Sequence, residues 1–414
     1  MPEDLADQLR PITAEEWPPF IRAMYDVFGD EPGGRFLDTP SPWAELDRSL
    51  SLWDAGRVVA TAGIYSRRLT VPGAVVPCAG VTWITVAPTH RRRGVLTAIM
   101  RRQLDDIRAA EQEPVAALWA AEASIYGRFG YAPATHRGGW TGRTQGMRLR
   151  PGVDTGTGTV RPAEPAEFRA AAVVLHEQLR RWVPGNLARD ERWWDRFMLD
   201  EPEERKGRPA KQLLLHTEAD GATTGYATYR RTSAWSESSE PQGEITVDEV
   251  RASTPAAYAA LWQYLLSIDL VRTVRSGMAS DDDPLRHLIA DVRALHAHPV
   301  DALWVRVVDV GRALSARRYP APLDMVFEVR DDFCPENTGR WHLWGHPAGA
   351  YCDRTDRDPD IVLGIEELSA AYLGGVSLAS LQAAGRVHEV SPGAVVQAST
   401  GFGWPVSPWC PDEF

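Results

Sequence analysis

The segment Arg91-Arg92-Arg93-Gly94 carries the clearest chemical signal in the sequence, because it joins a hydrophobic run to a helical pattern. A helix start leaves its first backbone N–H groups without intrahelical partners, and these groups favour a bound anion together with the positive end of the helix dipole. Gly94 would let the backbone approach that anion closely. A lone arginine run is usually a solvated turn, but the flanking elements favour a cradle for a pyrophosphate.

Hydrophobic patterns on both sides predict the elements that position this turn. Residues 81–86 form a hydrophobic strand, and Pro114 is followed by a second one at 115–119. Between them, residues recur at a spacing of three and four, as on the buried face of a helix; they are Val95, Leu96, Ile99, Met100, Gln103, Leu104 and Ile107. The sequence therefore predicts a strand, an arginine and glycine turn, a helix and a second strand, in that order.

The motif Arg91-x-x-Gly94-x-Leu96 resembles the acetyl-CoA motif of the GCN5-related N-acetyltransferases, R/Q-x-x-G-x-G/A, from which it departs at Leu96. Residues 86–100 and 121–131, the second of which ends in Phe-Gly-Tyr, are similar to the Eis (enhanced intracellular survival) acetyltransferases of actinobacteria, and the similarity extends to the last residue. The resemblance implies an acetyl-CoA-dependent N-acetyltransferase with an α/β (α+β) fold. Tandem GCN5-related acetyltransferase domains would be followed by a sterol-carrier-protein-like α+β domain.

The composition excludes several classes of protein. With 44% hydrophobic and 24% charged residues the chain is of ordinary globular type. The sequence contains neither an apolar run of about 18 residues nor a signal-peptide pattern at its acidic start, so we expect a cytoplasmic location without a membrane span. A net charge of −11 disfavours nucleic acid and favours cationic small molecules or lysine-rich peptides. Four widely spaced cysteines predict buried thiols, with neither a disulfide framework nor a metal site.

Length and repeated patterns divide the chain into three predicted domains. Its 414 residues suggest about three domains of roughly 150 residues each, and a glycine- and threonine-rich stretch after Leu149 marks the first boundary. We expect 1–150 to bind acetyl-CoA. We expect 151–300 to be a degenerate copy, because it repeats the order of helix, hairpin, strand and helix but has no Arg-x-x-Gly-x-Gly motif after Val250.

Residues 301–414 are expected to form the sterol-carrier-like domain, which opens with an alternating strand at 303–310 and supplies the C-terminal carboxylate. We expect this domain to have a structural and tail-positioning role in place of lipid carriage. An ordinary α+β packing module is the alternative.

The resemblance assigns the contacts to the co-substrate acetyl-CoA. The helix start would hold the pyrophosphate, the strand edge before the turn would pair with the pantetheine, and the end of the next strand would complete the set. These residues are Arg93, Gly94, Val95, Leu96, Thr97 and Ala98 for the pyrophosphate, Thr85, Val86 and Ala87 for the pantetheine, and Ala121 and Glu122 for the last group.

Tyr126 is predicted as the general acid through its place in the segment that resembles the family. A free phenol titrates near ~10 and a thiol near ~8.5, so a neutral tyrosine is protonated at pH 7 and can hand its proton to the departing thiolate. A packed aromatic residue without chemistry is the alternative. His90 and His136 are expected to be turn residues.

The terminal carboxylate of Phe414 is predicted as the general base, as the resemblance to Eis-like enzymes implies. An α-carboxylate near ~3.5 lies about six or seven units below a lysine ammonium. It can therefore accept a proton only if burial raises its pKa and neighbouring ammonium groups lower that of the acceptor; otherwise it holds and orients the ammonium. Chain ends usually fray, but the prolines and aromatic residues of 408–414 predict a packed tail. Glu122 acting through water is the conventional alternative base.

Acceptor recognition is expected from carboxylates and aromatic walls around that cleft. The candidates for ammonium contacts are Asp26 and Glu413, and the candidates for the walls are Phe36, Trp83, Ile84 and Trp119, although each could be plain core. We expect aminoglycoside-type antibiotics or lysine side chains as acceptors, and a homo-oligomer that is a hexamer by resemblance. The alternatives are a non-catalytic acyl-CoA or lipid-binding protein and an N-acetyltransferase for an unknown natural amine.

Overall fold

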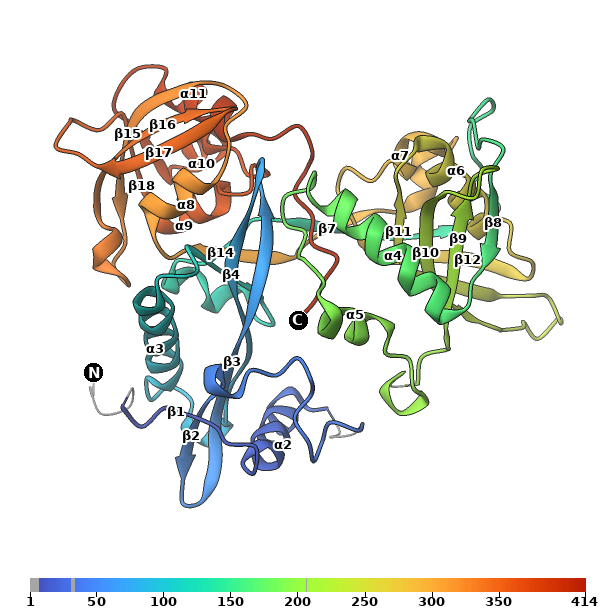
Figure 1. Cartoon of the computed structure of the whole chain (residues 1–414), viewed down its shortest axis with the longest axis horizontal. Coiled ribbons are helices and arrows are strands. Elements are labelled where there is room, and N and C mark those ends of the chain that lie inside the picture. The colour runs from blue at the N-terminus through green and yellow to red at the C-terminus, as the bar shows by residue number, and fades with distance from the viewer. Residues whose placement is uncertain (1–6, 31–33, 206) are drawn as a thin grey trace. The chain divides into compact units, whose positions relative to one another are not determined.

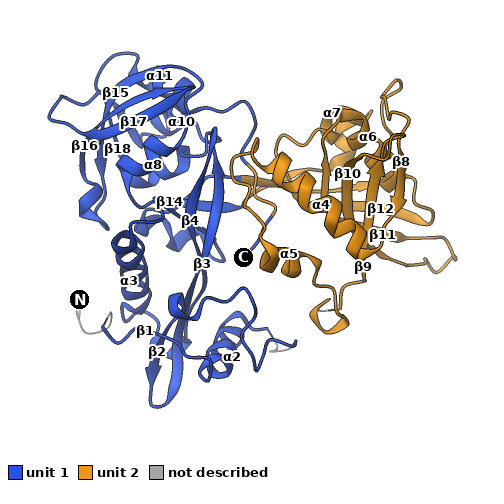
Figure 2. Cartoon of the chain, viewed as in Figure 1, with its two compact units in different colours: residues 1–135, 302–408, 412–414 blue, residues 136–301, 409–411 orange. Residues whose placement is uncertain are grey.

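The computed structural model describes residues 7–30, 34–205 and 207–414, so most of the acidic N-terminus, residues 1–6, lies outside the described residues. The chain forms two compact units (Figure 2). Unit 1 comprises residues 1–135, 302–408 and 412–414, and unit 2 comprises residues 136–301 and 409–411. Three β-sheets, each with helices, build these units (Figure 1).

The first sheet has seven strands in the order β1-β2-β3-β4-β5-β14-β6. Their bounds are β1 (Arg10–Pro11), β2 (Leu50–Asp54), β3 (Arg57–Val71), β4 (Ala74–Val86), β5 (Val115–Trp119), β14 (Leu303–Val307) and β6 (Ala132–Pro133). β3 and β4 form a long antiparallel hairpin, and the helix α3 (Val95–Ala110) connects β4 to the parallel strand β5. Met100 and Leu104 of α3 pack against Val81 of β4 in the core, which fixes the helix on the sheet. A second helix, α2 (Trp17–Phe28), buries Phe20 beside Trp83.

β4 and β5 separate just before the arginine and glycine turn. Their pairing runs from Cys78 with Val115 to Val81 with Leu118, whereas β4 continues to Val86. A register shift against β3 marks a bulge in this last part of β4, where Trp83 adopts a left-handed φ of 55°. A bulge bends a strand and re-aims its backbone. One edge of β4 beyond Val81 therefore lies outside the pairing with β5.

The second sheet repeats this architecture in the order β8-β9-β10-β11-β12-β7-β13. Its strands are β7 (His136–Arg143), β8 (Thr159–Pro162), β9 (Lys211–Thr217), β10 (Thr223–Thr232), β11 (Gly243–Ala252), β12 (Val271–Ala279) and β13 (His298–Asp301). Its helices are α4 (Pro165–Arg180), α5 (Glu191–Met198), α6 (Pro255–Leu266) and α7 (Leu285–Leu288). The parallel pair β11 and β12, with α6 between them in the chain, corresponds to β4, α3 and β5.

The two halves exchange a strand. When the two strand orders are aligned, β14 takes the place in the first sheet that β7 takes in the second, although β7 follows β6 in the chain and β14 follows β13. β14 pairs with β5 along its whole length, from Leu303 with Trp119 to Val307 with Val115, and all of its residues are buried. The strand expected to open the third domain is therefore an inner strand of the first sheet.

The third sheet has the order β17-β16-β15-β18-β19. Its strands are β15 (Leu323–Arg330), β16 (Gly339–His346), β17 (Gly349–Arg354), β18 (Ile361–Gly364) and β19 (Val387–Glu389), and its helices are α8 (Val310–Ala316), α9 (Ile365–Ala371), α10 (Leu378–Ala383) and α11 (Ala394–Phe402). Arg317 is fully buried here. It donates to the carbonyls of Tyr372 and Phe402, at 2.5 and 2.7 Å, and its guanidinium lies 4.7 Å from the ring centres of Tyr319 and Phe402. A cation with its aromatic and carbonyl partners thus fills part of this interior.

Several smaller expectations can be compared with these elements. All four cysteines are buried and free, as predicted. His90 ends a short helical turn, Pro88–His90. His136 is the first residue of β7, where it pairs with Asp301 of β13, so its prediction as a turn residue was wrong. None of the described helices is both long and apolar enough to cross a bilayer. Within the same described ranges, no cluster of three His, Cys, Asp or Glu side chains could hold a metal ion.

Candidate functional site

The start of α3 has the features of an anion cradle. Gly94 is its N-cap, with a φ of +86° that favours glycine, and no side chain caps the helix. A β-carbon at Gly94 would have no heavy atom within 4 Å, so the space in front of the helix start is open. The first-turn N–H groups of Val95, Leu96 and Thr97 have no acceptor inside the helix, and Arg93 is exposed beside them. The geometry suits a phosphate group.

The backbone that leads into this cradle is held from the β3 side. The hydroxyls of Thr85 and Thr61 lie 2.6 Å apart, and Thr61 also donates to the carbonyl of Trp83 at 2.7 Å. The N–H of Ala87 donates to the carbonyl of Val59 at 2.8 Å. These bonds fix the bulge and the end of β4, so the strand edge predicted to pair with pantetheine has a rigid support on its other side.

Tyr126 lies after the end of β5, between two short helical turns, Ala123–Ile125 and Gly127–Phe129. Its side chain is 6% exposed and its ring packs edge-on against Tyr131, with 6.2 Å between the ring centres. Burial, and then the negative charge of Glu122, raise the pKa of Tyr126 to about 12. Ala121 and Glu122 form the exposed bend between β5 and the first of these turns. The phenol is thus neutral and sequestered, while Glu122 is in solvent.

The C-terminal residue packs onto β3 and β4. The ring of Phe414 meets the ring of Tyr65 edge-on, with 6.4 Å between their centres. A β-carbon at Gly80 would lie 3.0 Å from Cε2 of Phe414 and 2.9 Å from Cγ of Arg67, so glycine makes room for both side chains. The indole Nε1 of Trp119, at the end of β5, donates to the carbonyl of Asp412 at 3.0 Å. The predicted packed tail is confirmed.

The structure gathers some of the acceptor-site candidates and separates others. Trp83 lies in an aromatic cluster, with its ring centre 5.1 Å from that of Tyr65 and 5.5 Å from that of Trp17. Through Tyr65 this cluster reaches Phe414, and Trp119 touches the same tail. The other candidates are placed differently. Glu413 is exposed, and Asp26 lies on the exposed side of α2. Ile84 belongs to β4, is partly buried and packs against the core, whereas Phe36 packs on Trp43 and accepts a hydrogen bond from Trp17 through its carbonyl.

Sequence reasoning missed Tyr65 and Gly80, which contact the side chain of Phe414, and the buried Arg67, which packs beside Gly80. One signal was available: along β3, Ser66 and Arg68 are exposed whereas Tyr65, Arg67 and Leu69 are buried. Arg67 is thus a charged residue on the buried face of a strand. Charged side chains are rarely buried unless they are paired. Nothing in the local sequence of Gly80 announces that Phe414 packs on it.

The equivalent helix start in the second sheet is closed. The Thr254 side chain accepts a hydrogen bond from the N–H of Ala257 at 3.1 Å, and Pro255 occupies the first helical position, where it has no N–H to offer. Two of the donors that an anion would need are therefore used or absent. That the second copy does not bind a nucleotide stays a prediction, which this closed helix start supports.

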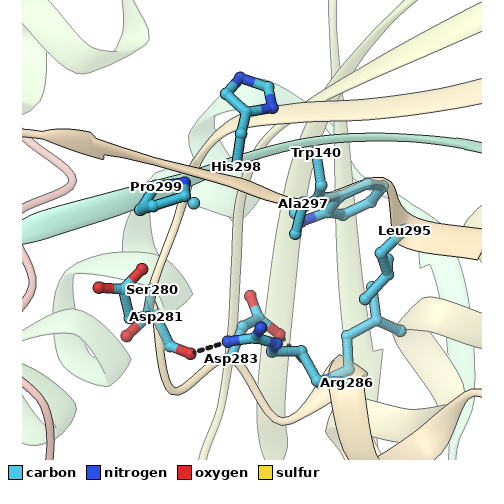
Figure 3. Close-up of a pocket in the computed structure, with 11 residues that line it drawn as sticks. Trp140, Ser280, Asp281, Asp283, Arg286, Leu295, Ala297, His298 and Pro299 are labelled. Carbon is cyan, nitrogen blue, oxygen red and sulfur yellow. Dashed lines mark hydrogen bonds between the residues drawn. The ribbon is translucent and has the colours of Figure 1, made fainter. Parts of the chain in front are cut away.

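Unit 2 contains a separate cavity of about 370 Å³ beside β7 (Figure 3). Its wall includes Trp140 and Leu295, and two of its charged side chains, Arg286 and Asp283, have partners within the chain. Arg286 donates to the carbonyl of Asp281 at 2.6 Å, and Asp283 accepts from the hydroxyl of Tyr258 and from the N–H of Leu285. All of the predicted site residues belong to unit 1, so this cavity is no part of the predicted site.

Three matches to known domain families span most of the chain. Residues 8–134 match an acetyltransferase (GNAT) domain, residues 185–307 match another acetyltransferase (GNAT) domain, and residues 310–411 match a sterol carrier protein domain. The predicted fold class, two acetyltransferase domains followed by a sterol-carrier-like domain, is confirmed.

The chain is similar to other proteins over most of its length. An uncharacterized N-acetyltransferase of Streptomyces avermitilis is 47% identical over 373 residues, which cover 89% of this chain and 90% of the relative. The N-acetyltransferase Eis of Mycobacterium tuberculosis is 34% identical over 393 residues, or 91% and 92% of the two chains. The crystal structure of Eis1 from Mycobacterium abscessus superposes with a TM-score of 0.82 at 33% identity, covering 98% of this chain and 100% of the other. With this site and this similarity over nearly all of its length, the chain belongs to the Eis family of GCN5-related N-acetyltransferases.

Proposed function

We propose that this enzyme transfers the acetyl group of acetyl-CoA directly to amines of aminoglycoside-type antibiotics or to lysine side chains. The observation that carries the proposal is the seat of Phe414 on Tyr65 and Gly80. It brings the chain end onto β4, the strand whose last residues lead into the open start of α3.

The residues present fit the co-substrate. Bound acetyl-CoA would supply the acetyl thioester. Arg93 and the backbone of Gly94, with that of Val95, Leu96, Thr97 and Ala98, would bind the pyrophosphate, because this helix start is uncapped and open. The edge of Thr85, Val86 and Ala87 would take the pantetheine, and Ala121 and Glu122 would flank it at the end of β5.

Tyr126 is proposed as the proton donor to the departing sulfur. With a pKa of about 12 it stays neutral at every working pH. Full transfer of its proton to a thiolate of pKa ~8.5 is uphill by about 3.5 units, or about 5 kcal/mol. We infer that Tyr126 acts by sharing its hydrogen with the sulfur as charge develops there, and that solvent supplies the final proton.

The carboxylate of Phe414 is proposed to hold the acceptor ammonium and to take its proton. Trp83 and Trp119 would add aromatic faces that attract cations, since both belong to the contacts that surround the tail. Amines with several neighbouring ammonium groups suit this site, because mutual repulsion lowers their pKa and eases the proton transfer. The net charge of −11 attracts such polycations, and the exposed Asp26 and Glu413 are candidates for secondary contacts. Phe36 and Ile84 would contribute wall surface only.

A lipid-binding protein is the less favoured function, because Arg317 and its partners occupy the interior of the sterol-carrier-like domain. By resemblance to the family we also propose that the enzyme works in the cytoplasm as a homo-oligomer, a hexamer. An N-acetyltransferase for an unknown natural amine has the same site and differs only in its acceptor.

The test is the release of CoA thiol with a panel of polyamines, aminoglycosides and lysine peptides. We expect turnover with polycationic amines, a loss of about 10²-fold or more in kcat for Tyr126→Phe, and a similar loss on deletion of Glu413 and Phe414. Adding one glycine after Phe414 keeps its ring but moves the carboxylate by about 3.5 Å, and it should be as damaging as the deletion. Tyr351→Phe, at a tyrosine that is 54% exposed, is the matched control. Unchanged kcat in the tyrosine and tail variants would refute the proposed acid and base.

A further inference from the structure

The second acetyltransferase domain keeps the strand opening of the first. β11 and β12 pair in parallel from Gly243 with Val271 to Val247 with Ser276, and both continue beyond the last pair, to Ala252 and Ala279. Between β4 and β5, the corresponding opening is where the pantetheine edge of the first domain lies. The opening between β11 and β12 is thus the equivalent acyl-CoA position in the second domain.

Trp409, from the C-terminal tail, occupies that opening. Its indole Nε1 donates to the carbonyl of Met278 on β12 at 2.7 Å. The guanidinium of Arg251 on β11 lies 4.4 Å from the centre of its ring. Both partners lie beyond the last paired residues of their strands, and Trp409 is only 9% exposed. The ring is therefore bound by both edges of the opening.

The backbone of Trp409 is held as firmly as its ring. Its N–H donates to the carbonyl of Pro184 at 2.8 Å, and its carbonyl accepts from Nδ2 of Asn186 at 2.6 Å. Asn186 is fully buried, and its other side-chain atom, Oδ1, accepts from Arg251 at 2.5 Å. The segment between α4 and α5 therefore binds the backbone of Trp409 at one defined position.

A buried charge network orders these partners. Glu249 accepts from Arg189 at 2.7 Å, from Arg251 at 3.0 Å and from the hydroxyl of Tyr226 at 2.7 Å, and it is 4% exposed. Two guanidinium groups share this one carboxylate, so the positive charge of Arg251 is not fully balanced by it. A tryptophan face is a good partner for such a cation.

We propose that Trp409 is an internal ligand of the second domain, that it fills the acyl-CoA position there, and that this anchor positions the last residues of the chain for catalysis. The final clause rests on the proposed function of Phe414. Phe414 follows Trp409 by five positions, so the anchor confines the chain end to within about 17 Å of it. The prolines at 408 and 411 restrict the chain on both sides of the anchor. Trp409, Asn186 and Arg251 are then positioning residues, and the second domain cannot take a second CoA.

Release of Phe414 by carboxypeptidase Y tests the anchor without reference to catalysis. In the full-length enzyme, Trp409→Ala and the near-isosteric Asn186→Leu should each speed release at least tenfold. Trp344→Ala, at a tryptophan that is 46% exposed on β16, is the control and should leave the rate unchanged. Unchanged release in both Trp409→Ala and Asn186→Leu, with the circular dichroism of the folded enzyme retained, would overturn the anchor. If Trp409→Ala does not fold, Asn186→Leu decides.

Kinetics then separate this proposal from the proposed function. If the anchor positions the chain end, Trp409→Ala and Asn186→Leu should each lower kcat at least tenfold. The Kd for CoA at the first domain should change less than twofold. In Asn186→Leu the enzyme should still bind one CoA per chain. Faster release with an unchanged kcat would overturn the positioning role. Deletion of Glu413 and Phe414 is the independent arm: if it leaves kcat intact, the carboxylate mechanism fails, and the carboxypeptidase result still decides whether Trp409 is an anchor.

Discussion

Tyr126 shows how burial sets the properties of a single group at this site. Because its charged form is disfavoured by burial and by Glu122, its pKa rises to about 12, and the phenol stays protonated two units further into the alkaline range than a free tyrosine. A tyrosine with an ordinary pKa would begin to lose its proton near pH 10, whereas Tyr126 should keep its proton at that pH.

We therefore predict that kcat does not fall between pH 8 and pH 10.5 through loss of a proton from Tyr126. The measurement is kcat with saturating acceptor over that range, for the native enzyme and for Tyr126→Phe. The two profiles should have the same shape, displaced by about 10² or more. A descending limb near pH 10 that is present in the native enzyme and missing in the variant would show that Tyr126 titrates normally, against the effect of its burial.

The residues of the site differ in how far the sequence could reveal them. The role of Gly94 could be predicted, because a glycine between a predicted strand and a predicted helix is typical of an anion-binding turn. Trp409 and Phe414 were expected to pack because the last seven residues contain two prolines and two aromatic residues, which are costly to leave in a frayed tail. Arg67 and Gly80 escaped notice, because their role depends on a chain end that is more than three hundred positions away in the sequence. The left-handed backbone of Trp83 was also hidden, since no local preference selects it.

At the scale of elements, the start of α3 can be compared with the start of α11, which has a similar backbone geometry but lies outside the proposed site. Gly94 and Gly393 are N-caps of α3 and α11 with φ values of 86° and 85°, and a β-carbon at either glycine would meet nothing within 4 Å. The two starts differ in one respect, because the carboxylate of Glu389 accepts a hydrogen bond from the N–H of Val395 in the first turn of α11, at 3.0 Å. An alanine at either position would therefore pay the same left-handed strain, about 1–2 kcal/mol. Only Gly94 faces the proposed pyrophosphate.

Gly94→Ala and Gly393→Ala should thus lower stability by similar amounts but differ in CoA binding. We expect Gly94→Ala to weaken the binding of CoA about tenfold, because the added methyl group occupies the space from which the anion reaches the backbone N–H groups. Gly393→Ala should leave the affinity within twofold. Isothermal titration with CoA and thermal unfolding supply both readings. Equal affinities in the two variants would place the pyrophosphate elsewhere.

Element patterns were predictable where one face of an element is buried. The three-and-four spacing of α3 gave its buried face, and Val95, Ile99, Gln103 and Leu104 are buried as that spacing requires. β12 and β7 were not predicted, because their exposed and buried residues include many arginines and glycines, which obscure a period of two. Their places in the second sheet follow from strand pairing across more than a hundred residues, which a local pattern does not contain.

At the scale of the whole molecule, the exchange of β7 and β14 couples parts of the chain that the sequence suggests are separate. Leu303 to Val307 alternate as a strand in any sheet would, so the sequence could not say which sheet receives them. In the structure β14 lies between β5 and β6, buried along its whole length. Without it β5 would lose one of its two hydrogen-bonded neighbours, and the buried edge would be exposed to water or to other chains.

We predict that residues 1–301 expressed alone do not form a native first domain, although they contain every residue of the proposed pyrophosphate cradle. The missing strand removes the pairs from Leu303 with Trp119 to Val307 with Val115, together with the core contacts of Trp304.

Co-expression with residues 302–414 should restore a soluble complex that binds CoA, because the exchanged strand can pair in trans as it does within one chain. The control is the same pair with Val305→Asp, which puts a charge on the buried strand and should block complementation. A fragment 1–301 that is monomeric, has native near-ultraviolet circular dichroism and binds CoA with the affinity of the full chain would mean that the exchanged strand adds nothing to the first domain. The dependence of the cradle on a strand two hundred residues downstream would then be refuted.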